Sequence, residues 1–522
     1  MKNNSILYII PPALSHRTAE ENLGVGYLAS YLRRKGYNVG IIDAWLERLS
    51  FDELLDRISQ FVSANESILF FGISTYLSNI NTVAPIVTNI KKLYTIPIVA
   101  GGFGPSFFRK EFLDIGVDFI SFGEGEQSSY ELCLYFENKI GLSDVGNVAY
   151  YDNENNIIYG KKADLVCNLD ELPFPARDTI KYVVNRKSSV NILSARGCMG
   201  HCTFCSVIAF QKLSKGKAWR GRSISNFVDE IECLYKGGIS FFKVIDDSFI
   251  EYPRDVVWCR NLADELEKRH IYARFRGSLI ADYVTDDILR ELKRAGFFSF
   301  ACGIESFAPS ALKRYGKRAT LEVNCKALEA FKNNNLYVQC GLILFDPYAT
   351  INELQINLHY LKRFKWVISK GIFTELYAAE GTVFTNKLLL EKGSGELQRD
   401  NENYRYQIQD FRVRNIYETL KKWHKTHAYI YDLVVDPLTS PKNISSLSMQ
   451  NLYELYLQIH ELDLFILEEL IDSSGFPYEY MMSLVDKKTN EFDEIYKAIE
   501  QEALTIYNEE QLIYDGILNK YL

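Results

Sequence analysis

The chain has 522 residues, of which 47% are hydrophobic and 24% are charged, as in an ordinary globular protein of more than one domain. Its formal net charge of −8 argues against a broad nucleic-acid surface, and no apolar run reaches the roughly 18–20 residues of a membrane span. The 10 cysteines are few for this length, and no basic and apolar leader follows Met1. We therefore expect a cytoplasmic protein with reduced thiols, and neither nucleic acid nor a membrane among its partners.

Residues 1–150 alternate short apolar segments with amphipathic ones. The apolar segments predict strands at 5–10, 38–42, 68–74, 96–100 and 118–123. The segments between them predict helices at 21–35, 51–62, 81–93 and after 126. Strands and helices in this order indicate a mainly parallel, doubly wound, Rossmann-like sheet with helices on both faces.

Three loops follow strands of this predicted domain, and ligands on such sheets bind beyond the carboxyl ends of the strands. Glycine lets the backbone approach a large flat ligand closely, although turn chemistry alone would explain any one loop. A dinucleotide fingerprint G-x-G-x-x-G is absent after the first strand, which disfavours NAD and FAD. The candidate ligand-binding residues are Ser74, Thr75, Tyr76, Gly101, Gly102, Phe103, Gly123, Glu124, Gly125 and Glu126.

A polar, proline-containing linker is expected at 151–185, and a strand at 189–194 then leads into three cysteines. Cys198, Cys202 and Cys205 have the spacing C-x3-C-x2-C. Three thiolates on one loop can bind three irons of a cubane cluster and leave the fourth iron open to a small molecule.

Other interpretations of the cysteines stay open at this point. A structural zinc site needs four ligands, and His201 is a conceivable fourth. A disulfide framework is typical of small secreted domains rather than of a chain of this length. The spacing favours the open iron–sulfur cluster over zinc and over coincidence.

Residues 186–370 continue as strand–helix units. Strands are predicted at 241–245, 272–278, 298–304 and 336–344, and helices at 225–236, 253–269, 286–295 and 321–333. This pattern predicts a partial or full (β/α) barrel, with its active site at the carboxyl ends of the strands. The polar residues expected there are Asp246, Asp247, Ser278, Glu305 and Ser306. Helix capping alone would explain each of these residues.

In residues 371–522 strands and helices no longer alternate. The chain is predicted to be mainly helical there, most strongly at 452–470 and 490–508. We interpret this region as a cap that shapes a substrate pocket, with a packed accessory bundle as the alternative. His424 and His427 have the spacing of a metal pair but lack a third ligand, so we expect them at the surface.

The cysteine motif, with Phe204 before its last cysteine, resembles that of the radical S-adenosylmethionine (SAM) superfamily. Residues 244–249, 276–278 and 303–306 resemble the later strand motifs of that superfamily. The first domain resembles the cobalamin-binding domain of one large branch, through the segments Pro11-Pro12, 23–32, Gly101-Gly102 and 123–126. The chain is therefore identified as resembling the cobalamin-dependent radical SAM enzymes over about residues 5–345.

The resemblance implies a 4Fe–4S cluster on Cys198, Cys202 and Cys205, whose open iron binds the amino and carboxylate groups of SAM. It implies SAM contacts from Phe204, Asp246, Ser278, Glu305 and Ser306, and cobalamin contacts from the ten candidate residues of the first domain. It further implies an external electron donor of the flavodoxin or ferredoxin type. It identifies no catalytic side chain.

The sequence departs from the family pattern in two respects. The motif D-x-H-x-x-G, which supplies a histidine to cobalamin, is absent, and the early His16 lacks its context. We therefore expect cobalamin to bind base-off without a histidine ligand, or the domain to be vestigial. The segment Gly341–Pro347 replaces the more usual Gly-Phe-Pro-Gly stretch.

Three functions follow from the resemblance. The first hypothesis is methylation of an unactivated carbon in a natural-product intermediate, either a small molecule or a peptide, driven by a 5′-deoxyadenosyl radical. The second is a radical ring contraction, cyclisation, dehydration or epimerisation in which cobalamin does not methylate or is absent. The third is a non-catalytic sensor of cobalamin or of the cluster.

Overall fold

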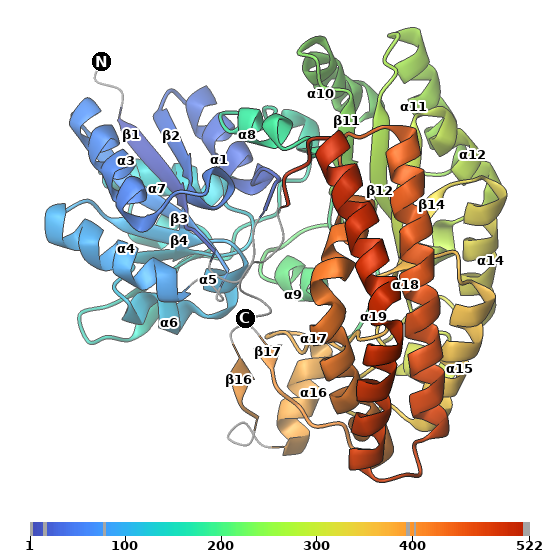
Figure 1. Cartoon of the computed structure of the whole chain (residues 1–522). Coiled ribbons are helices and arrows are strands. Elements are labelled where there is room, and N and C mark those ends of the chain that lie inside the picture. The colour runs from blue at the N-terminus through green and yellow to red at the C-terminus, as the bar shows by residue number, and fades with distance from the viewer. Residues whose placement is uncertain (1–3, 14–17, 77–79, 393–396, 401–402, 515–522) are drawn as a thin grey trace.

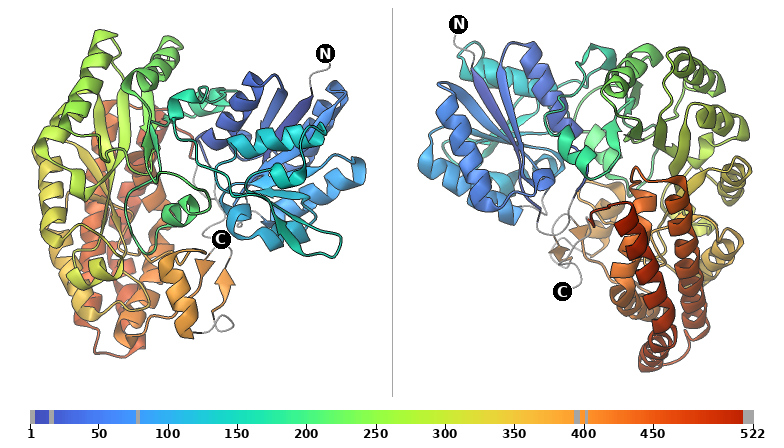
Figure 2. Two further views of the ribbon diagram at one scale, coloured as in Figure 1. Left: turned by 180° about the vertical axis from the view of Figure 1, so that it is seen from behind. Right: turned by 45° about the horizontal axis from the view of Figure 1, so that its top comes forward.

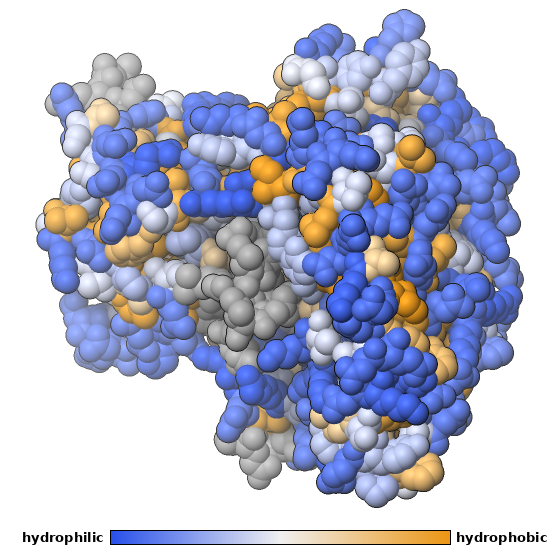
Figure 3. Space-filling model, viewed as in Figure 1, coloured by the Kyte–Doolittle hydropathy of each residue, from blue (hydrophilic) through white to orange (hydrophobic). Residues whose placement is uncertain are grey.

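The computed structural model describes residues 4–13, 18–76, 80–392, 397–400 and 403–514. Figure 1 shows an α/β region at the N-terminus, a second α/β region in the middle of the chain and long helices toward the C-terminus. Among the described residues, no helix is both long enough and apolar enough to span a membrane. The face drawn in Figure 3 is mainly hydrophilic, with apolar side chains scattered over it.

The first region is built on a seven-stranded sheet with the order β2-β1-β3-β4-β5-β6-β7. Its first five strands in sequence are parallel, and β6 and β7 are antiparallel additions at one edge. The strands are β1 (Ser5–Ile10), β2 (Asn38–Asp43), β3 (Ile68–Ser74), β4 (Ile98–Gly101), β5 (Phe119–Ser121), β6 (Val148–Tyr151) and β7 (Ile157–Tyr159).

Helices cover both faces of this sheet, because the buried strands are apolar on both sides. One face packs against α3 (Phe51–Ala64), α4 (Ile80–Leu93) and α6 (Arg109–Asp114). The other face packs against α1 (Leu23–Arg34) and α7 (Glu126–Phe136). The predicted doubly wound fold is confirmed. Strand β7 lies in the stretch expected to be linker, because the turn at Asp152–Asn156 folds the chain back onto β6.

The second region is a six-stranded, fully parallel sheet with the order β15-β14-β13-β12-β11-β8. Its strands are β8 (Val190–Ile192), β11 (Phe241–Val244), β12 (Arg274–Ile280), β13 (Phe297–Glu305), β14 (Tyr337–Leu342) and β15 (Ile368–Ser369). Among the described residues β8 and β15 do not pair with each other, so the barrel is partial. The two views in Figure 2 show the curved sheet beside its helices.

The helices of this region follow the strands in chain order. They are α10 (Ile224–Lys236), α11 (Val256–Lys268), α12 (Asp286–Arg294), α13 (Pro309–Arg314), α14 (Leu321–Asn333) and α15 (Ile351–Arg363). Side-chain caps define several of their starts: Ser223, Asp255, Thr285, Thr320 and Thr350 each accept a hydrogen bond from the first turn of the helix that follows. These caps fix the residue at which each of the five helices begins.

The C-terminal region consists mainly of α17 (Phe411–Thr439), α18 (Ser446–Asp472) and α19 (Tyr478–Glu509), shown in orange and red in Figure 1. It contacts both edges of the partial barrel. At one edge the Tyr431 hydroxyl donates a hydrogen bond to the Ser369 carbonyl in β15 at 2.6 Å. At the other, the Asn443 amide donates to the Lys187 carbonyl, just before β8, at 2.6 Å. The helices therefore lie across the gap between the two edge strands.

The expectation that His427 lies at the surface is wrong. Its ring is buried and stacks on Tyr496 of α19 at a centroid distance of 3.8 Å. One ring nitrogen is 2.9 Å from the Trp423 carbonyl. The cause is that α17 packs between two other long helices, so a position that a single helix would expose is covered here.

Candidate functional site

The cysteine loop begins at a short two-stranded ribbon. Strand β9 (Ala195–Arg196) pairs with β10 (Arg220–Gly221) just before Gly197. Gly197 has φ +87°, and a Cβ there would lie 1.9 Å from the Ala218 carbonyl, so the turn requires glycine. At its other end the loop runs into α9 (Ser206–Gln211), whose N-cap is Cys205. The three cysteines thus lie on a loop between two defined elements.

Two of the three cysteine sulfurs border the same space. The three thiols are free and only partly exposed. A Cβ on Gly200 would lie 3.2 Å from the Cys198 sulfur and 4.0 Å from the Cys202 sulfur, so both sulfurs turn toward the same space. Among the described residues no three His, Cys, Asp or Glu side chains converge as ligands of a single metal ion would. In a cubane cluster, by contrast, each thiolate binds a separate iron, so the three sulfurs need not converge on one ion.

A buried carboxylate contacts the start of the loop. Glu251 Oε1 accepts a hydrogen bond from the Met199 amide at 3.2 Å and lies 3.6 Å from the Cys198 sulfur. The Glu251 side chain is fully buried, and Arg318 approaches its other oxygen at 3.9 Å. Glu251 was not among the predicted site residues, because nothing in its local sequence places it beside Cys198.

The carboxylates after β11 lie in different environments. Asp246 is buried, accepts hydrogen bonds from the Ser194 amide at 2.7 Å and from the Ser194 hydroxyl, and lies 3.8 Å from Arg254. Burial raises the pKa of Asp246 to about 6, opposed by Arg254. Asp247 is exposed, accepts from the Gly197 amide at 3.1 Å and lines the cavity described below. Of the two carboxylates, Asp247 is the one that a ligand can reach.

Glu305 and Ser306 at the end of β13 also differ. Glu305 has φ +61°, an unusual conformation for a residue with a side chain, and its carboxylate lies 3.6 Å from Lys317 Nζ. Burial raises the pKa of Glu305, and the Lys317 ammonium opposes this rise. Ser306 is fully buried, and its hydroxyl donates to Asn357 Oδ1 at 3.0 Å. The Ser306 side chain is therefore directed into the protein, and its role as a SAM contact stays a prediction.

The two other residues expected to contact SAM are partly exposed. Ser278 lies in β12, opposite Ala301 of β13, and its carbonyl accepts a hydrogen bond from the Phe249 amide at 3.2 Å. Phe204 lies between the second and third cysteines, with its ring edge-on to Tyr315. Both residues stay predictions as SAM contacts.

A cavity of about 500 Å³ lies between the first region and the cysteine loop. Every candidate cobalamin residue except Thr75 lines it. From the second region it is lined by residues next to the cysteines, including Gly197 and Ser206. Phe103 of the first region stacks on Phe210 of α9 across it, with ring centroids 6.4 Å apart. The three predicted loops and the cysteine loop therefore share one space.

The lining of this cavity fits a large, mostly apolar ligand with polar edges. The buried Tyr8 hydroxyl lines the cavity without a hydrogen-bond partner of standard geometry among the described residues, and Ser129 is its polar neighbour. No histidine belongs to the described lining, and His16 lies outside the described residues. A bound ligand with polar groups would satisfy Tyr8.

The two glutamates of the third loop pair with arginines of the second region. Glu126 lies 2.6 Å from Arg196, and Glu124 lies 2.7 Å from Arg220. Arg196 also lies 3.6 Å from Glu124. These carboxylates line the cavity but are held by ion pairs, so they join the regions as well as bordering the ligand space. Arg196 was not among the predicted site residues, although its position two residues before Cys198 was a signal that could have identified it.

Two family models match the chain. The model of the radical SAM superfamily matches residues 192–361, and the model of the B12 binding domain matches residues 14–132. The matched ranges contain the cysteine loop and the three loops that line the cavity.

Three curated relatives illustrate the similarity. An uncharacterized methyltransferase of Pyrococcus horikoshii is 26% identical over 382 residues, which cover 70% of this chain and 79% of that protein. The hopanoid C-3 methylase of Methylococcus capsulatus is 26% identical over 63% of this chain and 61% of that protein. The 4′-phospho-dehydrooxetanocin synthase of Priestia megaterium is 25% identical over 66% of this chain and 48% of that protein. The match thus spans less than two thirds of the last two proteins.

Solved structures share the fold. The cobalamin-dependent SAM radical enzyme OxsB, with aqua-cobalamin and SAM bound, matches 98% of this chain and 82% of its own at a TM-score of 0.77 and 18% identity. The radical SAM methyltransferase TsrM from Kitasatospora setae, with tryptophan and a SAM analogue bound, matches 74% of this chain and 76% of its own at a TM-score of 0.63 and 16% identity. The likeness to OxsB extends over the C-terminal helices.

Proposed function

Because this chain belongs to the cobalamin-dependent radical SAM enzymes, whose cofactors are a 4Fe–4S cluster, SAM and cobalamin, we propose that it methylates a carbon atom of a small molecule. The observation that carries the proposal is the shared cavity. It is bordered by the loops of the first sheet on one side and by neighbours of Cys198 and Cys205 on the other. A methyl carrier bound there lies beside the place where the radical is generated.

We assign the cluster to Cys198, Cys202 and Cys205, and cobalamin to the cavity. When bound, the cluster and SAM supply a 5′-deoxyadenosyl radical that removes a hydrogen atom from the substrate, and cobalamin supplies the methyl group. The exposed Asp247 and the Glu305–Lys317 pair are charged groups near the cysteine loop, and we assign to them the orientation of the ammonium and carboxylate of SAM.

The protein's own residues bind and orient the cofactors and the substrate, and they exclude water. The rings of Phe103 and Phe210, one from each region, stack on each other and form an apolar part of the cavity wall. The ion pair between Arg196 and Glu126 holds the strand before the cysteine loop against the first region. A radical intermediate needs such an enclosed site, because side reactions with solvent compete with transfer.

Isotope labelling tests the proposal. The protein is purified without oxygen in the presence of cobalamin, reduced with a flavodoxin or ferredoxin as the proposed electron donor, and supplied with SAM that carries a deuterated methyl group. Methylation predicts S-adenosylhomocysteine and 5′-deoxyadenosine together, and three deuterium atoms in the product. Formation of 5′-deoxyadenosine without S-adenosylhomocysteine, with bound cobalamin and a converted substrate, would refute it.

A radical rearrangement is the second candidate. One curated relative is named a synthase rather than a methylase, and the fold match to OxsB covers nearly the whole chain. In this case the product keeps the carbon count of the substrate. The same labelling experiment separates the two candidates, because a rearrangement transfers no deuterium from the methyl group of SAM. The identity of the substrate is a separate question that candidate compounds must answer.

A further inference from the structure

The peptide between the second and third cysteines is held by the turn that follows α13. The Thr203 amide donates a hydrogen bond to the Tyr315 carbonyl at 2.8 Å, and the Thr203 hydroxyl donates to the Arg314 carbonyl at 3.1 Å. A Cβ on Gly316 would lie 3.0 Å from the His201 carbonyl, so the two segments are in close contact. The position of this half of the loop therefore depends on the turn after α13.

Tyr315 contacts the cysteine loop on one side and a different element on the other. Its carbonyl holds Thr203, and its ring lies edge-on to the Phe204 ring at 5.6 Å. Its hydroxyl donates a hydrogen bond to Asp346 Oδ2 at 2.5 Å. The side chain is 1% exposed, so water does not compete for this hydrogen bond. Tyr315 thus connects the loop to the segment between β14 and α15.

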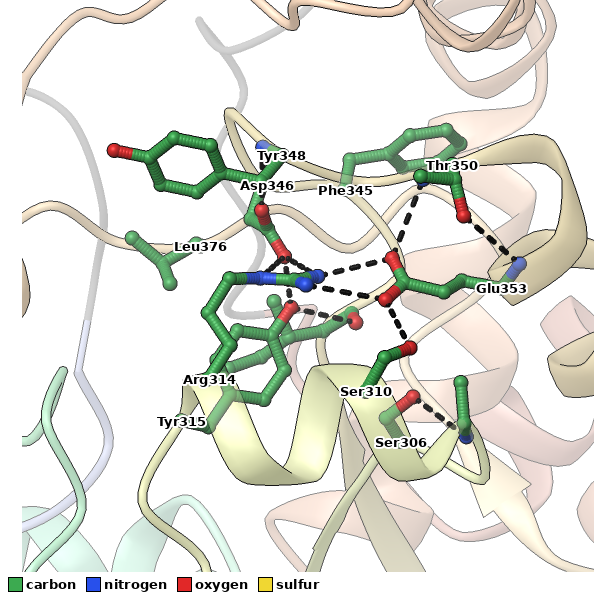
Figure 4. A network of polar contacts seen from close by, with 12 residues as sticks. Ser306, Ser310, Arg314, Tyr315, Phe345, Asp346, Tyr348, Thr350, Glu353 and Leu376 are labelled. Carbon is green, nitrogen blue, oxygen red and sulfur yellow. Dashed lines mark hydrogen bonds and ion pairs between the residues drawn. The ribbon is translucent and has the colours of Figure 1, made fainter.

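Asp346 is in turn fixed by a buried charge network, drawn in Figure 4. The Arg314 guanidinium lies between two carboxylates, 2.7 Å from Asp346 and 3.0 Å from Glu353. The second oxygen of Asp346 accepts a hydrogen bond from the Tyr348 amide at 2.7 Å. Buried charges require partners of this kind, because an unpaired carboxylate would lose its hydration without compensation. Asp346 therefore has little freedom to move.

Glu353 anchors the network to a helix. Its carboxylate accepts a hydrogen bond from the Thr350 amide at 3.2 Å, and the Thr350 hydroxyl accepts one from the Glu353 amide at 3.3 Å. This reciprocal pair is the capping box of α15. Asp346 itself lies in the segment Gly341–Pro347, where the sequence departs from the usual family pattern. The chain therefore has an acidic residue of its own at this place.

We propose that Tyr315 and Asp346 form a strut that sets the position of the Cys202–Cys205 half of the cysteine loop. Both are positioning residues, since they act on the cluster and on SAM through Thr203 and Phe204. The inference rests on the cluster assignment made above. A network with a purely structural role would affect the melting temperature alone, whereas a strut also affects how tightly the loop holds its iron and SAM.

The test uses Tyr315→Phe, which removes the hydroxyl and keeps the ring and the carbonyl. Glu353→Gln is the matched control, because it changes the same network without touching Tyr315, and glutamine also forms capping boxes. Both full-length proteins are reconstituted without oxygen. The measurements are iron and sulfide content, the rate of iron release to a chelator, the dissociation constant of SAM and the melting temperature.

We expect Tyr315→Phe to release iron about 3–10-fold faster and to bind SAM more weakly by a similar factor, because the effect of losing one hydrogen bond to a charged group, roughly tenfold or more, reaches the loop only in part. Glu353→Gln is expected to lower the melting temperature at least as much while iron release and SAM binding stay near those of the unmodified protein. Equal iron release and SAM binding in Tyr315→Phe and the unmodified protein would overturn the strut. So would changes in both variants that simply follow their melting temperatures.

A second variant tests the role of Asp346, the acceptor of the Tyr315 hydrogen bond. Asp346→Asn keeps the size of the side chain and removes its charge, and we expect it to reproduce the faster iron release of Tyr315→Phe. If this variant fails to fold, Tyr315→Phe still decides the question. Failure of the unmodified protein to bind about four irons would refute the cluster assignment itself, whereas normal loading with an unaffected Tyr315→Phe variant would refute only the strut.

Discussion

The guanidinium of Arg196 lies 2.6 Å from the carboxylate of Glu126, and this ion pair joins the strand before the cysteine loop to the first turn of α7. Both side chains are mostly buried. The pair therefore links the region that the B12 binding domain model matches directly to the cysteine loop. Its geometry holds the third cavity-lining loop of the first region against the strand that leads into the cysteine loop.

Glu126→Gln should uncouple the two regions. Of the carboxylates described beside it, Arg196 then keeps Glu124, at 3.6 Å, and loss of a buried partner is costly. We expect product formation to fall by about tenfold or more, because small displacements of reacting groups have effects of this size. Iron content should stay unchanged. Lys110→Ala, which removes an exposed pair with Asp114, is the control. Unchanged turnover in Glu126→Gln would contradict this role.

Single replacements of Cys198, Cys202 or Cys205 by alanine should abolish the cluster. Each thiolate binds its own iron, so two remaining ligands do not hold a stable cubane. The expected result is loss of iron, sulfide and SAM cleavage, measured by chemical analysis and by 5′-deoxyadenosine formation. Cys167→Ser, at an exposed cysteine outside the loop, should keep all three. A variant of the loop that retained full iron and sulfide would exclude its cysteine as a ligand.

Glu251→Gln should raise the reduction potential of the cluster. The carboxylate lies 3.6 Å from the Cys198 sulfur, and a nearby negative charge disfavours the addition of an electron. Glutamine keeps an acceptor for the Met199 amide. We expect a positive shift on the order of 100–200 mV, from the Coulomb energy of two charges about 4–7 Å apart at an effective dielectric of about 20, converted for a one-electron couple. Redox titration followed by electron paramagnetic resonance measures it. The control is Glu329→Gln, at an exposed ion pair with Arg363, which should leave the potential unchanged. An unchanged potential in Glu251→Gln would show that the charge of Glu251 does not act on the cluster.

Asp463→Asn should stabilise the protein at alkaline pH. Burial raises the pKa of Asp463 to about 7, opposed by a hydrogen bond from Trp423 Nε1 at 2.9 Å. The folded protein therefore binds a proton that the unfolded chain releases near pH 4, and the stability contributed by Asp463 is lost as pH rises from about 4 to 7.

The asparagine variant removes this dependence. Its advantage over the unmodified protein should grow by about 2–3 kcal/mol between pH 5 and pH 8, as judged from denaturant unfolding of both proteins. Asp472→Asn, at an exposed position at the end of the same helix, should give no pH-dependent difference. A difference between Asp463→Asn and the unmodified protein that does not grow with pH would refute the assignment of the titration to Asp463.

Local sequence patterns were sufficient for most of the secondary structure. The segment Ser5–Ile10 predicted a strand because it is a short, continuous apolar run, as expected for a strand buried on both faces. The spacing of apolar residues within 21–35 predicted a helix because burial on a helix repeats every 3.6 residues. The same patterns could not reveal that His427 is buried, because its burial comes from Tyr496, about 70 residues later in the chain.

The site shows the same division. The spacing of Cys198, Cys202 and Cys205 was readable because all three lie on one loop, and the glycine loops were readable because they follow strands. The direction of the Ser306 side chain could not be predicted from the sequence, because its hydroxyl donates a hydrogen bond to Asn357, which lies on a later helix. Glu251 and Tyr315 likewise become neighbours of the cysteine loop only when distant strands come together.

The sequence by itself determined the order of strands and helices, the two α/β regions and the cysteine motif, because each depends on residues close together in the chain. Only the tertiary structure decided that the barrel is partial, that Glu124 and Glu126 pair with arginines of the other region, and that Tyr315 connects the cysteine loop to Asp346. These relationships join residues from about 30 to more than 90 positions apart, and their partners are selected by packing and by the need to pair buried charges.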